Sequence, residues 1–179
     1  MKFREVTASD LALQKELLLV ALWTPDDEPD HDPKVLELAH IKAYFEEWGK
    51  SGDLGLFALN QFDEPIGIVQ IRYKSSQTVQ YAEYPELAMA VHASHRGKGV
   101  ASALMKALLQ RVEGSCDGIR LGVHPKNEAA QKLYEKFGFV TYEIAQSGFP
   151  QWYERSKPLS LNTTLKAKTQ GRIDATDIP

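Results

Sequence analysis

The stretch that decides the fold runs HRGKGVA and spans residues 95–101. It lies between a run with strand character, residues 86–91, and a run with helix character, residues 100–112. Gly97 and Gly99 have no Cβ, so the backbone can turn sharply there and present successive N–H groups. The helix that follows directs the positive end of its dipole onto the loop. The heptapeptide therefore predicts a cradle for a phosphate or pyrophosphate, with Arg96 and Lys98 adding charge at the rim.

Two common phosphate loops do not fit this spacing. The nucleoside triphosphate loop needs a glycine, four residues, Gly-Lys and then Ser or Thr, and the stretch does not match it. The dinucleotide fingerprint needs a third glycine three residues after the second, where Ser102 stands. Arg96, Gly99 and Ala101, between a strand and a helix, resemble the coenzyme A pyrophosphate loop of the GNAT N-acyltransferase superfamily.

A second segment, residues 127–139, resembles the signature of a later helix in that superfamily. Asn127 is a favourable N-cap residue. Apolar residues recur at helical spacing from Ala130 to Phe137. Gly138 fits a left-handed cap at the end of the helix. The two signatures occur together with a strand-like run between them, residues 119–123, and this combination identifies the sequence as similar to the superfamily.

Length and composition agree with one globular domain. A chain of 179 residues, 43% hydrophobic and 25% charged, supports a single substantial core. The net charge of −3 gives no sign of a nucleic-acid or anionic-membrane partner. Cys116 is the only cysteine, which excludes an intrachain disulfide and favours a reducing compartment. No apolar run reaches the roughly 18 residues of a membrane helix, and we expect a cytoplasmic protein.

The order of expected elements matches an α/β fold. We expect a GNAT-type mixed central sheet flanked by helices, with antiparallel N-terminal strands and a parallel pair at the cofactor cleft. The expected strands cover residues 3–7, 54–59, 66–73, 86–92, 119–123 and 152–159, and the expected helices cover residues 10–23, 34–48, 100–112 and 127–137. The domain is predicted over residues 1–159, with a polar C-terminal extension over residues 160–179. The extension is either a frayed terminus or, from its weak alternation, a strand docked at a sheet edge or on a partner subunit, which leaves a homodimer open.

The resemblance implies transfer of an acyl group, usually acetyl, from acetyl-CoA to the primary amine of a small molecule or peptide, in a ternary complex and without a metal. It implies Tyr134 as the acid that protonates the departing thiolate. Asn127 would hydrogen-bond the pantetheine arm, cap its helix, or both. The amide of Val91 would pair with pantetheine and stabilise the oxyanion. The cofactor-binding residues implied are Val91, Arg96, Gly97, Lys98, Gly99, Val100, Ala101, Ser102, Asn127 and Tyr134.

The base is expected to be Glu86, which opens the strand before the glycine loop, with Glu83 or a water relay as alternatives. Five acids in the loop of residues 24–33 form an acidic wall that would attract a cationic amine, or only a solvated loop.

Two other functions stay open. One is a non-catalytic acyl-CoA-binding module with a regulatory role. The other is an acyltransferase that uses a different donor, such as a longer acyl-CoA or an acylated tRNA.

Overall fold

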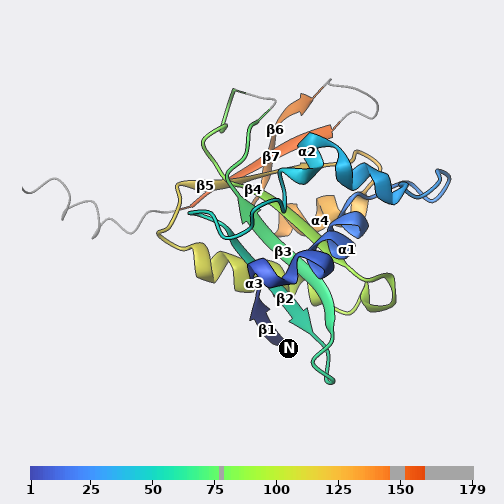
Figure 1. The fold of residues 1–179 in the computed structure, drawn as a ribbon. Coiled ribbons are helices and arrows are strands. Elements are labelled where there is room, and N and C mark those ends of the chain that lie inside the picture. The colour runs from blue at the N-terminus through green and yellow to red at the C-terminus, as the bar shows by residue number, and fades with distance from the viewer. Residues whose placement is uncertain (77–78, 146–151, 160–179) are drawn as a thin grey trace, which may run out of the picture.

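A mixed seven-stranded sheet in the order β1-β2-β3-β4-β5-β7-β6 runs through the centre of the molecule (Figure 1). The structure is a computed structural model that describes residues 1–76, 79–145 and 152–159. The strands are β1 Lys2–Glu5, β2 Leu54–Leu59, β3 Pro65–Arg72, β4 Glu86–Val91, β5 Gly118–Val123, β6 Val140–Ala145 and β7 Trp152–Pro158. Only the β4–β5 pair is parallel within the described residues, and all other neighbours are antiparallel. The predicted mixed sheet with a parallel pair is confirmed.

Helices cover both faces of the sheet. They are α1 Leu11–Ala21, α2 Ala39–Lys42, α3 Val100–Val112 and α4 Glu128–Lys136, with short 3-10 turns η1 Ala8–Asp10, η2 Pro33–Glu37 and η3 Ala93–His95. Helices α1 and α2 lie in front of the sheet in Figure 1, and α3 lies behind it. None of the described helices is long and apolar enough to cross a membrane.

Strand alternation divides β4 between two cores. Leu87 and Val91 pack in the cluster beneath α3 and α4, with Leu104 and Leu108. Ala90 points to the opposite face, into the cluster that contains Leu17 of α1. Because successive side chains of a strand face opposite sides of the sheet, Glu86 lies on the α1/α2 face together with Ala90.

The helix predicted over residues 34–48 is wrong. Leu38 has an extended ψ of 136°, which separates η2 from the single turn of α2. Glu47, at φ 53°, stops any continuation. The buried guanidinium of Arg72 takes the place of helical hydrogen bonds here, donating to the carbonyls of Glu46 at 2.7 Å and Glu47 at 3.1 Å. A buried cation therefore organises the end of this segment as turns.

The C-terminal part of the sheet contains a strand that the sequence analysis missed. The predicted last strand forms β7, but β7 lies between β5 and an unexpected edge strand, β6. Val140 and Ile144 of β6 are 66% and 49% exposed, so this strand lacks the buried apolar face that makes a strand recognisable. The predicted extension, residues 160–179, lies outside the described residues.

Candidate functional site

The parallel strands β4 and β5 are hydrogen-bonded to each other only near their amino ends, the closed end of the pair, and they separate toward their carboxyl ends, the open end. Their register has a single Cα pair, Glu86 with Arg120, beside which the Arg120 amide donates to the Pro85 carbonyl at 3.1 Å. Toward their carboxyl ends the strands border a pocket of about 440 Å³. Open α/β sheets place ligands at such a position, outside the carboxyl ends of their parallel strands.

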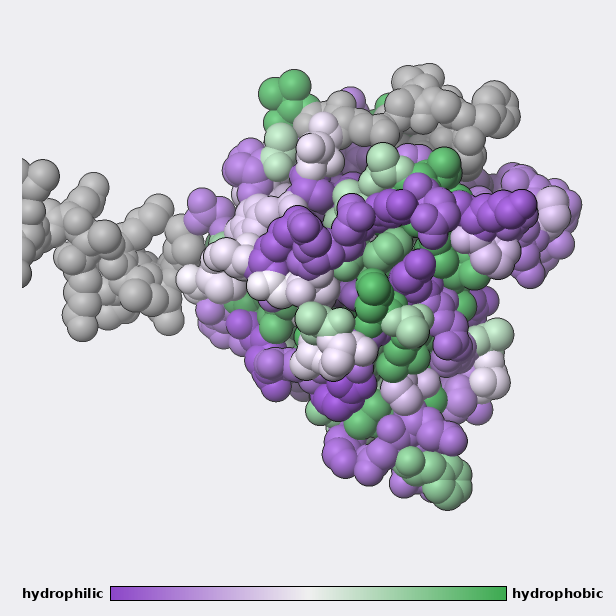
Figure 2. Space-filling view, in the orientation of Figure 1, coloured by the Kyte–Doolittle hydropathy of each residue, from purple (hydrophilic) through white to green (hydrophobic). Residues whose placement is uncertain are grey.

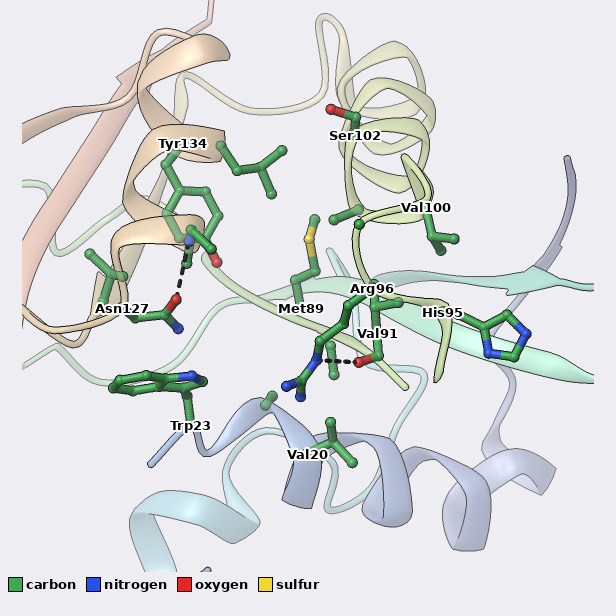
Figure 3. A pocket seen from close by; sticks show the side chains of 18 of the residues that line it. Val20, Trp23, Met89, Val91, His95, Arg96, Val100, Ser102, Asn127 and Tyr134 are labelled. Carbon is green, nitrogen blue, oxygen red and sulfur yellow. Dashed lines mark hydrogen bonds between the residues drawn. The ribbon is translucent and has the colours of Figure 1, made fainter. Parts of the chain in front are cut away.

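Helices α1, α3 and α4 and strands β4 and β5 all contribute residues to this pocket. Figure 3 shows Met89 and Val91 of β4 at its floor, Tyr134 and Asn127 from α4 on one side, and Ser102 from α3 on the other. The lining also includes residues that sequence analysis did not single out, Val20, Trp23, Gly122 and His124. Most of these are apolar and carry no motif, so only their place beside the strand ends reveals them.

The glycine loop forms one wall of the pocket. Gly97 and Gly99 have φ values of 70° and 79°, in the left-handed region where side chains with a Cβ are strained. A Cβ built at either glycine meets no other atom within 4 Å, so the outer surface of the loop is open. Gly99 is also the N-cap residue of α3. The loop is therefore built as predicted, a left-handed turn directly before a long helix.

Unused hydrogen-bond donors gather at this loop. Within the described part of the chain, no N–H from residue 97 to residue 102 makes a hydrogen bond of normal geometry to backbone or side chain. The first N–H groups of a helix have no partner inside it. Together with the helix dipole, these donors make a binding site for an anion. The residues present therefore fit the pyrophosphate of coenzyme A.

The two cations of the loop behave differently. The Arg96 side chain reaches back along β4 and donates from Nε to the Val91 carbonyl at 3.1 Å (Figure 3). Lys98 is exposed and donates from Nζ to the Ser94 carbonyl at 2.9 Å. Arg96 lines the pocket and Lys98 is not among the residues that do. Arg96 thus holds the loop against the end of β4.

Two backbone N–H groups of β4 point away from β3 and toward the pocket. His92 donates from its N–H to the Ile66 carbonyl at 3.0 Å, which makes the even-numbered residues of β4 the ones bonded to β3. Because these bonds alternate along an antiparallel pair, the N–H groups of Met89 and Val91 point toward β5. The strands no longer pair there, so both groups can meet a ligand.

Tyr134 and Asn127 are fixed from α4. The Asn127 Oδ1 accepts from the Ala130 amide at 3.1 Å and so caps the helix, while the residue also lines the pocket. Tyr134 is 8% exposed and packs its ring at 5.8 Å from that of Phe139. Burial raises the pKa of Tyr134 to about 12, and the charge of Arg155 opposes this shift. The phenol therefore keeps its proton at neutral pH.

Glu86 lies at the closed end of the strand pair, outside the pocket lining. Its carboxylate accepts from Tyr44 Oη and from a guanidinium nitrogen of Arg120, and Lys74 Nζ lies 3.2 Å from its Oε2. Arg120 is 2% exposed. These three partners occupy the carboxylate, and the role of Glu86 as base stays a prediction.

The loop of residues 24–33 reaches the far side of the pocket. Trp23 contacts His124 with ring centroids 5.1 Å apart. Lys126 Nζ lies 3.8 Å from carboxylate oxygens of both Asp27 and Glu28. The loop forms a hydrophilic projection from the molecule (Figure 2). Its acids thus stand near the β5–α4 turn.

The fold and the sequence both match known acetyltransferases. Among solved structures, an acetyltransferase from Acinetobacter baylyi superposes with a TM-score of 0.68 at 20% identity, covering 88% of this chain and 92% of that one. A GNAT-family acetyltransferase from Streptococcus pneumoniae gives 0.65 at 23% identity over 89% and 99%. Phosphinothricin acetyltransferase from Sinorhizobium meliloti, solved with acetyl-CoA, gives 0.61 at 17% identity over 91% and 90%.

Curated relatives match a shorter stretch. N-alpha-acetyltransferase 30 from Xenopus laevis is 43% identical over 53 residues, which are 29% of this chain and 19% of the relative. The human protein of that name is 42% identical over 53 residues, 29% and 15% of the two chains. The match thus spans less than a fifth of these relatives. The acetyltransferase (GNAT) family profile matches residues 18–139, well over half of the sequence, and the chain therefore belongs to the GNAT family of acetyltransferases.

Proposed function

We propose that this acetyltransferase moves the acetyl group of acetyl-CoA to a primary amine of a small molecule or peptide by direct transfer in a ternary complex. The observation that carries the proposal is the row of unused N–H donors from residue 97 to residue 102 beside the open end of β4 and β5. These donors suit a pyrophosphate, and the unpaired edge of β4 suits an extended amide-bearing arm. The only cysteine, Cys116, is buried away from the pocket lining, which supports direct transfer over a thiol intermediate.

Each group of the pocket has a place in this reaction. Acetyl-CoA supplies the thioester that the amine attacks. Backbone amides of residues 97–102 bind the pyrophosphate, and the Met89 N–H bonds the pantetheine arm. The Val91 N–H donates to the carbonyl oxygen as negative charge develops on it. Asn127 keeps its side-chain amide nitrogen for the arm, since its oxygen caps α4.

Tyr134 acts as the general acid in this proposal. Its pKa of about 12 keeps the hydroxyl protonated, so it can donate to the sulfur while the carbon–sulfur bond breaks. Arg155 stabilises the phenolate that forms, since its charge favours the ionised state. A proton from the amine nitrogen restores the phenol.

The acceptor is proposed to be a cationic amine, with a peptide N-terminus as the first candidate. The matched N-alpha-acetyltransferase 30 relatives support a peptide by their names. The acidic loop of residues 24–33 supports a cation, because carboxylates raise the local concentration of positive ligands. Lys126 neutralises part of this charge through Asp27 and Glu28. Asp26, Asp30 and Asp32 have no ion-pair partner among the described residues, so their charges remain to act on a substrate.

Turnover of acetyl-CoA tests the proposal. Free thiol release should be measured with the full chain over a panel of peptides with free N-termini, polyamines, aminoglycosides and amino acids. We expect turnover with at least one amine and a matching mass gain of one acetyl group on that amine. Tight acetyl-CoA binding without turnover across the panel would instead support a regulatory module. Preference for succinyl-CoA over acetyl-CoA in competition would support another donor.

A further inference from the structure

A second carboxylate, Glu154, lies on the same face of the sheet as Glu86. Glu154 is on β7, and its Cα partner on β5 is Gly122, which lines the pocket. Directly opposite residues of antiparallel strands place their side chains on one face. Because Gly122 has no side chain, Glu154 supplies the side chain at this level of the sheet. Two pairs along the ladder, Arg120 opposes Ser156 on that same face.

Glu154 differs from Glu86 in its contacts. Glu86 is held by Tyr44, Lys74 and Arg120. Glu154 is half-buried, and its carboxylate makes no hydrogen bond or ion pair within the part of the chain that the structure describes. A base must have a free lone pair to accept a proton. Neither carboxylate is among the residues that line the pocket, and of the two only Glu154 has oxygens without a hydrogen-bond partner among the described residues.

The charges around Glu154 come from every strand beside it. Burial raises its pKa to about 7, and Glu86 on β4 and Glu143 on β6 also raise it. Arg120 on β5 and Lys74, which follows β3, act in the opposite direction. Tyr44, which follows α2, also senses the Glu154 charge. A proton acceptor works best when it changes charge near the working pH.

We propose that Glu154 is the catalytic base that takes the proton of the attacking amine, an inference that rests on the proposed function. The ammonium N–H bond breaks and its proton goes to a Glu154 oxygen, which leaves the nitrogen lone pair free. That pair forms the carbon–nitrogen bond while the carbon–sulfur bond breaks and its electrons stay on sulfur. Sulfur takes the Tyr134 proton, and a second proton from nitrogen restores the phenol. Glu154 then releases its proton to water, so each cycle yields one amide, one thiol and one proton.

The test uses Glu154→Gln, which keeps the shape of the side chain and removes its basicity. Using the best amine of the panel, kcat/KM should be followed from pH 5.5 to pH 9.5. The parent should show an ascending limb with a midpoint near 7. Glu154→Gln should lose that limb and fall about a hundredfold at pH 7.5. Its affinity for acetyl-CoA by calorimetry should stay that of the parent, which also checks its folding.

Two comparisons separate a base from a merely structural residue. An acceptor whose amine is already neutral at pH 7.5 should react with Glu154→Gln within about threefold of the parent rate, because it needs no base. Glu143→Gln, the matched control on the neighbouring strand, should keep the limb and shift its midpoint downward, since Glu143 raises the pKa of Glu154.

The outcomes distinguish the two proposals. A parent that binds acetyl-CoA but acetylates no amine contradicts the proposed function and the base with it. A parent that turns over while Glu154→Gln keeps its limb and its rate within twofold contradicts the base alone. Loss of the limb in Glu86→Gln, with Glu154→Gln unchanged, would assign the base to Glu86.

Discussion

The two ends of the β4–β5 pair use the same parallel strands for opposite purposes. At one end Glu86 and Arg120 form a buried ion pair that Lys74 and Tyr44 complete. At the other end Val91 and Val123 border a pocket, and the backbone N–H donors of β4 face this pocket instead of β5. At the closed end the charged groups form contacts with other groups of the protein. The open end leaves polar groups unpaired, which is what a ligand site requires.

This difference separates stability from function along a single pair of strands. Buried charges are tolerated at the closed end because every one of them has a partner. Unpaired donors are tolerated at the open end because water or a ligand reaches them. Variants at the closed end should therefore change unfolding, and variants at the open end should change binding or turnover.

The largest effect is expected from Arg120→Met at the closed end. The change leaves the Glu86 carboxylate with fewer partners in a buried position, and losing one member of such a pair typically costs about 3 to 5 kcal/mol. The free energy of unfolding should be measured by urea titration. Arg111→Met is the control, because Arg111 pairs with Glu5 on the surface with both side chains more than half exposed. The free energy of unfolding of the control should change by about 1 kcal/mol or less. Equal losses in the two variants would contradict a larger contribution of the buried pair to stability.

Tyr134→Phe should act at the open end without touching stability. The variant keeps the ring that packs on Phe139 and loses only the hydroxyl. We expect kcat to fall about a hundredfold, with acetyl-CoA affinity by calorimetry unchanged. A kcat within twofold of the parent would show that Tyr134 only packs.

Gly99→Val should weaken acetyl-CoA binding. A β-branched residue at φ 79° is strained by about 1 to 3 kcal/mol. The backbone shift that relieves this strain turns the N–H groups of residues 97–102 away from a shared ligand. Affinity should fall about tenfold to a hundredfold. Gly114→Val, at the other end of α3, has φ 75° and equally empty surroundings. If both variants bind acetyl-CoA alike, the loop has no special part in binding.

The smallest effect concerns the pH dependence of stability. The pKa of Glu154 is raised to about 7 by burial, so between its unfolded value and pH 7 the folded chain holds a proton that the unfolded chain has released. Stability from this group is present at low pH and is lost as the pH rises through 7. Glu154→Gln should therefore gain thermal stability over the parent at pH 8 and little at pH 4. A gain that is the same at both values would contradict the raised pKa.

The sequence predicted the open end well and the closed end poorly. Glycines at 97 and 99 and the N-cap at Asn127 carry local signals, because backbone conformation and capping depend on neighbours in the chain. Helix α3 was predicted with the bounds that the structure shows. Arg120, by contrast, finds Glu86 across 34 positions of the chain, and no local pattern encodes that pairing.

Glu154 escaped the sequence analysis for the same reason. Its place beside Gly122 depends on β7 entering the sheet between β5 and β6, a crossover that the order of elements does not fix. Glu86 was chosen because it lies near the glycine loop in sequence, yet the structure surrounds it with cations. Proximity along the chain thus predicted the left-handed turn before α3, while tertiary contacts decide the surroundings of each carboxylate.

Amide hydrogen exchange of the full chain, with and without acetyl-CoA, tests most directly that the open end of β4 and β5 is the acyl-CoA site. We expect acetyl-CoA to slow exchange of the N–H groups of residues 97–102 and of Met89 and Val91, and to leave Arg120 at the closed end unchanged. Protection confined to other parts of the chain, with these amides unaffected, would contradict this expectation.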